Sequence, residues 1–125
     1  MTANLEIAKA MYGAFARADM NTVFTGLAND VEYIHHGEVP WAGSFKGFDG
    51  AKKFFELLGQ TIQFEQYQPT EFYEDGDSII VVGHTVATVR ATGARFDSHW
   101  VNVLKSRDGK LLRFVGYDTA SIAES

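Results

Sequence analysis

The apolar residues at the start of the chain recur with helical spacing. Leu5, Ala8, Met11, Tyr12 and Phe15 are each three or four residues from another member of the set. Side chains with this spacing lie on one face of an α-helix, while the residues between them face water. The pattern predicts an amphipathic first helix whose apolar stripe packs on the interior of the protein.

Two further helices are predicted from capping residues that precede apolar positions. Asp19 suits the N-cap of a short second helix, and Asp49 suits the N-cap of a longer third helix in "FDGAKKFFELLGQTI". The apolar residues of these helices are Val23, Phe24 and Leu27 in the second and Ala51, Phe54, Phe55 and Leu58 in the third.

The other segments have the pattern of strands and turns. "DVEYIHH" reads as a strand, and "GEVPWAGSFKG" reads as a loop because Gly and Pro interrupt it. The second half contains the runs "QFEQYQPTEFYE", "SIIVVGHTVATVRA", "ARFDSHWVNVLKS" and "KLLRFVGYD", separated by the hairpin signals "DGD", "ATGA" and "SRDG". Helices followed by a meander predict a single α+β domain over residues 1–125, with a curved antiparallel sheet folded over the helices.

Alternation in the last two strands predicts which side chains share a face, because strand residues point to opposite sides in turn. In the first of these strands, one face carries Trp100, Asn102 and Leu104, and the other carries His99, Val101, Val103 and Lys105. In the second, one face carries Leu112, Phe114, Gly116 and Asp118, opposite Arg113 and Tyr117. Lys105 marks the outer side, so we expect Asn102 and Asp118 to point into one enclosed space.

The composition of the chain indicates which classes of molecule the protein can bind. The 125 residues carry a net charge of -5 and contain no basic run, which disfavours nucleic acid as a partner. The absence of cysteine excludes disulfides and thiolate chemistry and fits a cytoplasmic location. No segment has the pattern of a signal peptide or a membrane span. Small molecules and other protein chains remain as expected partners.

The histidines offer candidate chemistry but no clear metal site. His35 and His36 are adjacent on a predicted strand, so they point to opposite faces, and which of them faces the interior stays open. His84 and His99 could pair across strands. We expect no metal ion there, because no cysteine or carboxylate can be placed at ligand spacing.

The order of elements resembles that of the SnoaL-like proteins within the NTF2-like, ketosteroid isomerase-like superfamily. The resemblance runs through "YGAFARADMNTVFTGLANDVEY", "WAGSFKGFDGAKKFF" and "HWVNVLKSRDGKLLRFVGYDTA". It implies a cone-shaped fold that encloses a pocket and pairs into homodimers. It is less informative about activity, because this fold carries cyclases, isomerases, hydrolases, dehydratases and binding modules.

The resemblance also implies positions for a site. His35 is similar in position to the catalytic base of the isomerases, and Asn102 lies near the place of an acid in their oxyanion hole. The place of their oxyanion tyrosine is similar to that of Met11, with Tyr12 one residue away. Asp118 resembles the acid/base aspartate of the polyketide cyclases. The expected catalytic residues are therefore Asp118, His35 and Asn102.

An aromatic pocket around these residues would support proton transfer. The side chains expected to line it are Tyr12, Phe15, Trp41, Phe54, Phe55, Leu58, Trp100 and Phe114, with Trp41 as a lid or rim. A carboxylate enclosed by such residues is poorly solvated, which favours its protonated form. The pattern favours removal of a proton next to a carbonyl, as in cyclases and isomerases, without a cofactor or metal ion.

Other roles remain open for the same residues. Asp118 could bond only to backbone amides at the last turn, and Asn102 could satisfy a buried backbone group. The pocket could bind an apolar small molecule without turnover. The protein could also be an assembly module that dimerises through its convex face, where Val101, Val103 and Val115 lie.

Overall fold

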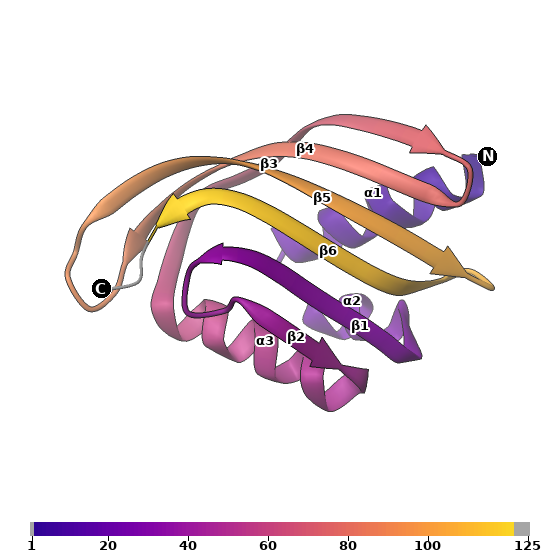
Figure 1. Cartoon of the computed structure of the whole chain (residues 1–125), viewed down its shortest axis with the longest axis horizontal. Helices are drawn as coiled ribbons and strands as arrows, with labels where there is room; N and C mark the ends of the chain where they lie inside the picture. Colours follow the sequence, from indigo (N-terminus) through magenta and orange to yellow (C-terminus); the bar gives the residue numbers. More distant parts are fainter. Residues whose placement is uncertain (1, 122–125) are drawn as a thin grey trace.

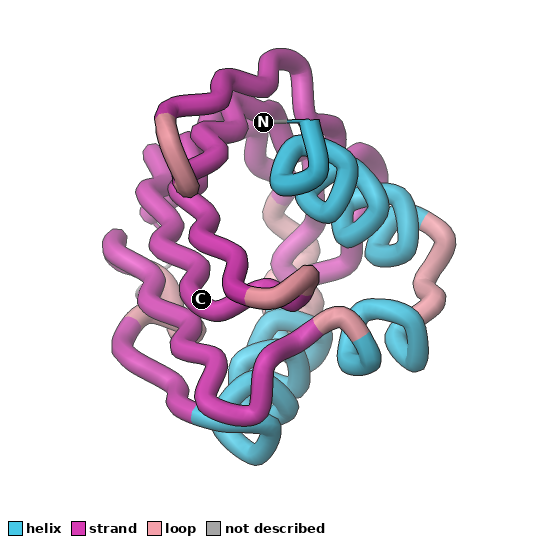
Figure 2. The backbone as a smooth tube through the Cα atoms, turned by 90° about the vertical axis from the view of Figure 1, so that its right-hand side faces the viewer, coloured by secondary structure: helices cyan, strands magenta, loops and turns pink. Residues whose placement is uncertain are grey.

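The computed structural model of the protein describes residues 2–121. This part of the chain forms the helices α1 (Thr2–Ala16), α2 (Met20–Thr25) and α3 (Gly47–Thr61). Its strands are β1 (Leu27–Glu38), β2 (Gly43–Lys46), β3 (Ile62–Asp75), β4 (Ser78–Val89), β5 (Arg95–Arg107) and β6 (Lys110–Ser121). Apart from the short β2, the strands are long and curved (Figure 1), and the helices lie on the concave side of the sheet (Figure 2).

The strands form one mixed sheet in the order β2-β1-β6-β5-β4-β3. Every neighbouring pair is antiparallel except β1 and β6, which are parallel. The expectation of a purely antiparallel sheet is therefore wrong. The connection from β1 through β2 and α3 is long enough for a crossover, so β1 can join the sheet beside β6, the last strand of the meander.

The second helix, α2, begins where its capping signal predicts but ends earlier than expected. Asp19 is the N-cap of α2, and its Oδ1 accepts a hydrogen bond of 3.2 Å from the backbone N–H of Thr22. The predicted end of α2 is wrong, because Gly26 closes the helix and Leu27 already belongs to β1, opposite Leu111 of β6. None of the helices described here is long and apolar enough to cross a membrane.

The segment expected as a loop contains the short strand β2. It pairs with β1, where Tyr33 lies opposite Phe45, and it leads directly into α3. The helix therefore begins at Gly47, with Lys46 as its N-cap residue, and the prediction that Asp49 is the N-cap is wrong. Asp49 lies in the first turn, where its negative charge stabilises the positive end of the helix dipole.

In β6, the side chains near the end of the strand point to the predicted faces, but those near its start do not. Phe114 and Asp118 face the interior, but Leu112 does not take the inner position predicted for it. Leu111 does, and it is 1% exposed. A register shift follows Lys105 in β5, so that Leu111 lies opposite Ser106. One extra residue in a ladder moves the following side chains to the other face.

Candidate functional site

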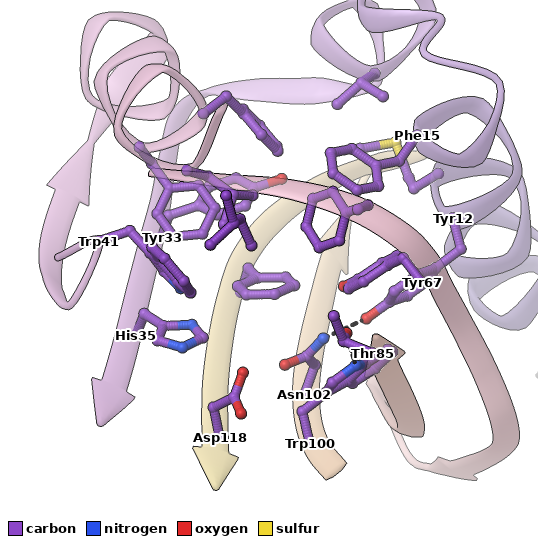
Figure 3. Close-up of a pocket in the computed structure, with 18 of the residues that line it drawn as sticks. Tyr12, Phe15, Tyr33, His35, Trp41, Tyr67, Thr85, Trp100, Asn102 and Asp118 are labelled. Carbon is purple, nitrogen blue, oxygen red and sulfur yellow. Dashed lines mark hydrogen bonds between the residues drawn. The ribbon is translucent and has the colours of Figure 1, made fainter. Parts of the chain in front are cut away.

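A cavity lies between the concave face of the sheet and the helices. It encloses about 790 Å³ of empty space, including its opening to solvent. The structure brings to its walls all the side chains expected from sequence: Tyr12, Phe15, His35, Trp41, Phe54, Phe55, Leu58, Trp100, Asn102, Phe114 and Asp118. Figure 3 shows the polar groups of His35, Asn102 and Asp118 gathered on one side of the cavity.

Three neighbouring strands place His35, Gly116 and Asn102 in one row. Gly116 of β6 lies opposite His35 of β1 and opposite Asn102 of β5. A Cβ atom on Gly116 would lie 2.6 Å from His35 Nδ1 and 3.0 Å from Asn102 Oδ1. The imidazole of His35 and the side-chain amide of Asn102 therefore lie over Gly116 from the two neighbouring strands. The missing side chain of Gly116 makes room for two polar groups at the cavity wall.

Asp118 extends this row along β6. It follows Gly116 by two residues, so its side chain leaves the same face of the strand. In Figure 3 its carboxylate points into the space between His35 and Asn102. Burial is the main cause of the raised pKa of Tyr67, and the negative charge of Asp118 contributes to it. The carboxylate thus acts electrostatically across the cavity.

His35 is a buried imidazole whose charged form is disfavoured. It is 7% exposed, and neither ring nitrogen has a hydrogen-bond partner within the described part of the chain. Burial lowers the pKa of His35 below its usual 6.5, although the charge of Asp118 opposes that shift. His36 points outward and stacks on Tyr117 instead. His35 is therefore the histidine that faces the cavity, as a neutral ring able to accept a proton.

Asn102 connects the row to a buried phenol. Its Nδ2 donates a hydrogen bond of 2.7 Å to the Oη of Tyr12, and the hydroxyl of Tyr12 in turn is directed at the hydroxyl of Tyr67. The pKa of Tyr12 is raised, chiefly by burial and also by the neighbouring Tyr67. A phenol with a raised pKa stays protonated at neutral pH. Tyr12 can therefore donate a hydrogen bond to a ligand in place of Tyr67, and Asn102 orients the phenol.

Aromatic rings form a flat wall beside these donors. The ring of Trp100 stacks on Tyr67 at 4.9 Å between centroids and on Tyr12 at 5.8 Å. The indole Nε1 of Trp100 donates a hydrogen bond of 2.8 Å to the Oγ1 of Thr85. A Cβ atom on Gly83 would lie 2.1 Å from the indole ring, so only glycine lets Trp100 lie flat across β4.

Trp41 belongs to the buried wall of the cavity. It is 3% exposed and is part of the hydrophobic core, with its ring centroid 6.0 Å from that of His35. The expectation of a rim residue is therefore wrong. The short strand β2 follows closely after Trp41 and ties this segment to β1, which allows a tryptophan outside regular structure to be buried.

Sequence reasoning missed several lining residues, notably Tyr33, Tyr67 and Leu111. Tyr33 precedes His35 by two residues on β1, so the alternation rule could have found it. Tyr67 could not be found in this way, because β3 has register shifts between Phe64 and Gln66 and between Pro69 and Glu71. These shifts break the alternation of its apolar residues.

We expect the burial of His35 to make stability depend on pH near neutrality. Because its pKa is lowered in the folded state, the unfolded chain binds more protons as pH falls below about 6.5, and the free energy of unfolding decreases. The slope is at most about 1.4 kcal/mol per pH unit. This slope is present between the unfolded pKa and the lower folded pKa of His35.

Urea denaturation between about pH 5 and 7.5 measures this effect. The slope in this range should disappear in His35→Gln and persist in His36→Gln, which replaces an exposed imidazole. An unchanged slope in His35→Gln would contradict the assignment.

Comparison with known proteins identifies relatives over most of the chain. A model of the SnoaL-like domain matches residues 8–114. No curated protein matches the chain. Among solved structures, an NTF2-like protein from Burkholderia xenovorans LB400 is 26% identical, with 94% of this chain and 90% of that chain covered and a TM-score of 0.84. An NTF2-like protein from Burkholderia pseudomallei K96243 is 27% identical, with 93% and 90% covered and a TM-score of 0.83.

A third similar structure comes from a protein that was co-crystallized with a small molecule. TerC, co-crystallized with polyporic acid, is 27% identical to this chain, with 91% of this chain and 89% of TerC covered and a TM-score of 0.80. Together these similarities confirm the α+β cone and the SnoaL-like resemblance that the sequence predicted.

Proposed function

The chain belongs to the SnoaL-like domain family, and we propose that its cavity performs cofactor-independent acid/base chemistry on an apolar carbonyl compound. The observation that carries the proposal is the row of His35, Gly116 and Asn102 with Asp118 on the same face. It supplies two proton acceptors and an amide-oriented phenol in one aromatic cavity. Cyclisation, isomerisation and elimination next to a carbonyl all begin with such a proton transfer.

The proposed step assigns one role to each polar group. The carboxylate of Asp118 removes the proton from the carbon next to the carbonyl, and the electron pair of that bond moves onto the carbonyl oxygen. The hydroxyl of Tyr12 donates a hydrogen bond to this oxygen, and Asn102 holds the phenol in place. The neutral imidazole of His35 accepts this proton from Asp118 and then gives it to another atom of the substrate or to solvent, which returns both the carboxylate and the imidazole to their starting forms.

The cavity walls support an apolar substrate with a flat part. Stacked rings of Tyr12, Tyr67 and Trp100 offer extended aromatic faces, and aromatic groups pack well on such surfaces. TerC was co-crystallized with polyporic acid. That compound is therefore a reasonable first probe of binding to this protein.

The experiment combines a binding screen with a test for proton exchange. Ligand-observed NMR would screen polyporic acid and a set of planar aromatic ketones against the wild-type protein. Each ketone that binds would be incubated in D₂O, and deuterium incorporation next to its carbonyl would be measured. Exchange that the protein accelerates supports the proposal. Binding without accelerated exchange in any ketone would favour a role in binding apolar molecules without turnover.

A further inference from the structure

Three side chains that can bind metal ions lie together on the outside of the sheet. His84 of β4 lies directly opposite His99 of β5, and Asp97 precedes His99 by two residues on the same face. The neighbouring residues Thr85 and Trp100 point the other way and line the cavity. The cluster of His84, Asp97 and His99 is therefore separate from the candidate active site.

The donor atoms of this cluster are close together. One nitrogen or oxygen from each residue lies within 4.8 Å of the others. Nε2 of His84 contacts Oδ1 of Asp97, and the rings of His84 and His99 stack with centroids 4.9 Å apart. Ligands of one zinc ion bond it at about 2.0–2.1 Å and so lie roughly 3.3 Å from one another. Modest side-chain rotations would bring the three donors to that separation.

The backbone beneath the cluster is already ordered, so binding requires little reorganisation. The ladder between β4 and β5 runs without a register shift from the pair of Ser78 and Lys105 to the pair of Thr88 and Arg95. The side chains can rotate because they lie at the surface. Asp97 is 65% exposed and His84 is 24% exposed at the side chain. A rigid ladder with adjustable ligands is suited to binding an ion from solution.

We propose that His84, Asp97 and His99 form a surface site for a divalent transition-metal ion such as Zn²⁺. Two imidazoles and one carboxylate suit zinc, nickel or copper, whereas magnesium and calcium prefer sets of oxygen ligands. Three protein ligands leave the outward side of the ion to water. The sequence pattern predicted no metal ion here, because no carboxylate could be placed at ligand spacing from the histidines. The register of β4 and β5 brings Asp97 beside His84.

The ion would link two neighbouring strands of the cavity wall. Any ligand that binds only the folded state stabilises it by mass action. We therefore expect zinc to raise the melting temperature of the wild-type protein, and the increase should grow with zinc concentration.

Isothermal titration with ZnCl₂, in a buffer that does not bind zinc, tests the site directly. The wild type should bind about one Zn²⁺ per chain, and His99→Asn and His84→Asn should each lower the affinity about tenfold or more. The matched control is His36→Asn, because His36 is also an exposed histidine on a strand. It should bind zinc as the wild type does, and so should His35→Asn, which alters the cavity.

Two results would overturn the proposal. One is a wild type that binds no zinc, and the other is a zinc affinity that is unchanged in His99→Asn. Thermal denaturation gives a second readout, since excess zinc should raise the melting temperature of the wild type and of His36→Asn but not that of His99→Asn. Magnesium at the same concentration should have no effect on any of them, and an equal rise with magnesium would contradict a histidine site.

Discussion

Replacing Asp118 by Asn should lower turnover about 10²- to 10⁴-fold, the range typical of losing a general acid/base group. The amide has nearly the same shape as the carboxylate but cannot accept the substrate proton. Asp118 lies on the inner face of β6 beside His35 and Asn102, so in the proposed mechanism the loss would act at the reacting atoms. The apolar walls and the hydrogen bond from Asn102 to Tyr12 are unaffected, and ligand affinity should change only a few-fold.

The measurement is the rate of deuterium incorporation into a ketone that binds the wild type, with the dissociation constant of the same ketone determined in parallel. Asp77→Asn is the control, because this exposed aspartate lies in the turn between β3 and β4. Turnover should be unchanged in the control. Wild-type exchange rates in Asp118→Asn would remove this residue from the mechanism, whereas an equal loss of binding would indicate that it holds the ligand.

Replacing Gly83 by Ala should destabilise the protein by about 3 kcal/mol, at the upper end of what overpacking a core usually costs. The added methyl group would lie 2.1 Å from the ring of Trp100. Trp100 cannot move aside freely, because it donates a hydrogen bond to Thr85 and stacks on Tyr67. Relief of the clash therefore requires the loss of this hydrogen bond, of the ring stacking, or of the local strand pairing.

Chemical denaturation of the variant and the wild type measures this effect. Gly59→Ala is a control that should change the free energy of unfolding in the opposite direction. Gly59 lies in α3, and a Cβ atom there would meet nothing within 4 Å. Alanine in a helix should stabilise the fold by about 0.5–1 kcal/mol. A free energy of unfolding for Gly83→Ala within about 1 kcal/mol of the wild type would contradict the tight packing of Trp100 against β4.

Local patterns identified the parts of the fold that depend on neighbouring residues in the chain. The stripe of α1, the cap at Asp19 and the inward positions of Trp100, Asn102 and Asp118 all follow from periods or capping within a few residues. The errors fall where pairing between strands changes a local preference. β2 forms because β1 is available to pair with it, and Leu111 turns inward because of the shift beside Lys105.

The sequence by itself determined the α+β class, the family resemblance and most of the polar and aromatic residues at the cavity wall. The periodicity of apolar residues depends only on residues close together in the chain, so it can be recognised without knowing which strands pair. Only the tertiary structure decided which groups meet. The row of His35, Gly116 and Asn102 requires the parallel pairing of β1 with β6, and the meeting of Asp97 with His84 requires the register of β4 with β5. Such registers arise from packing of the whole sheet, which no single segment encodes.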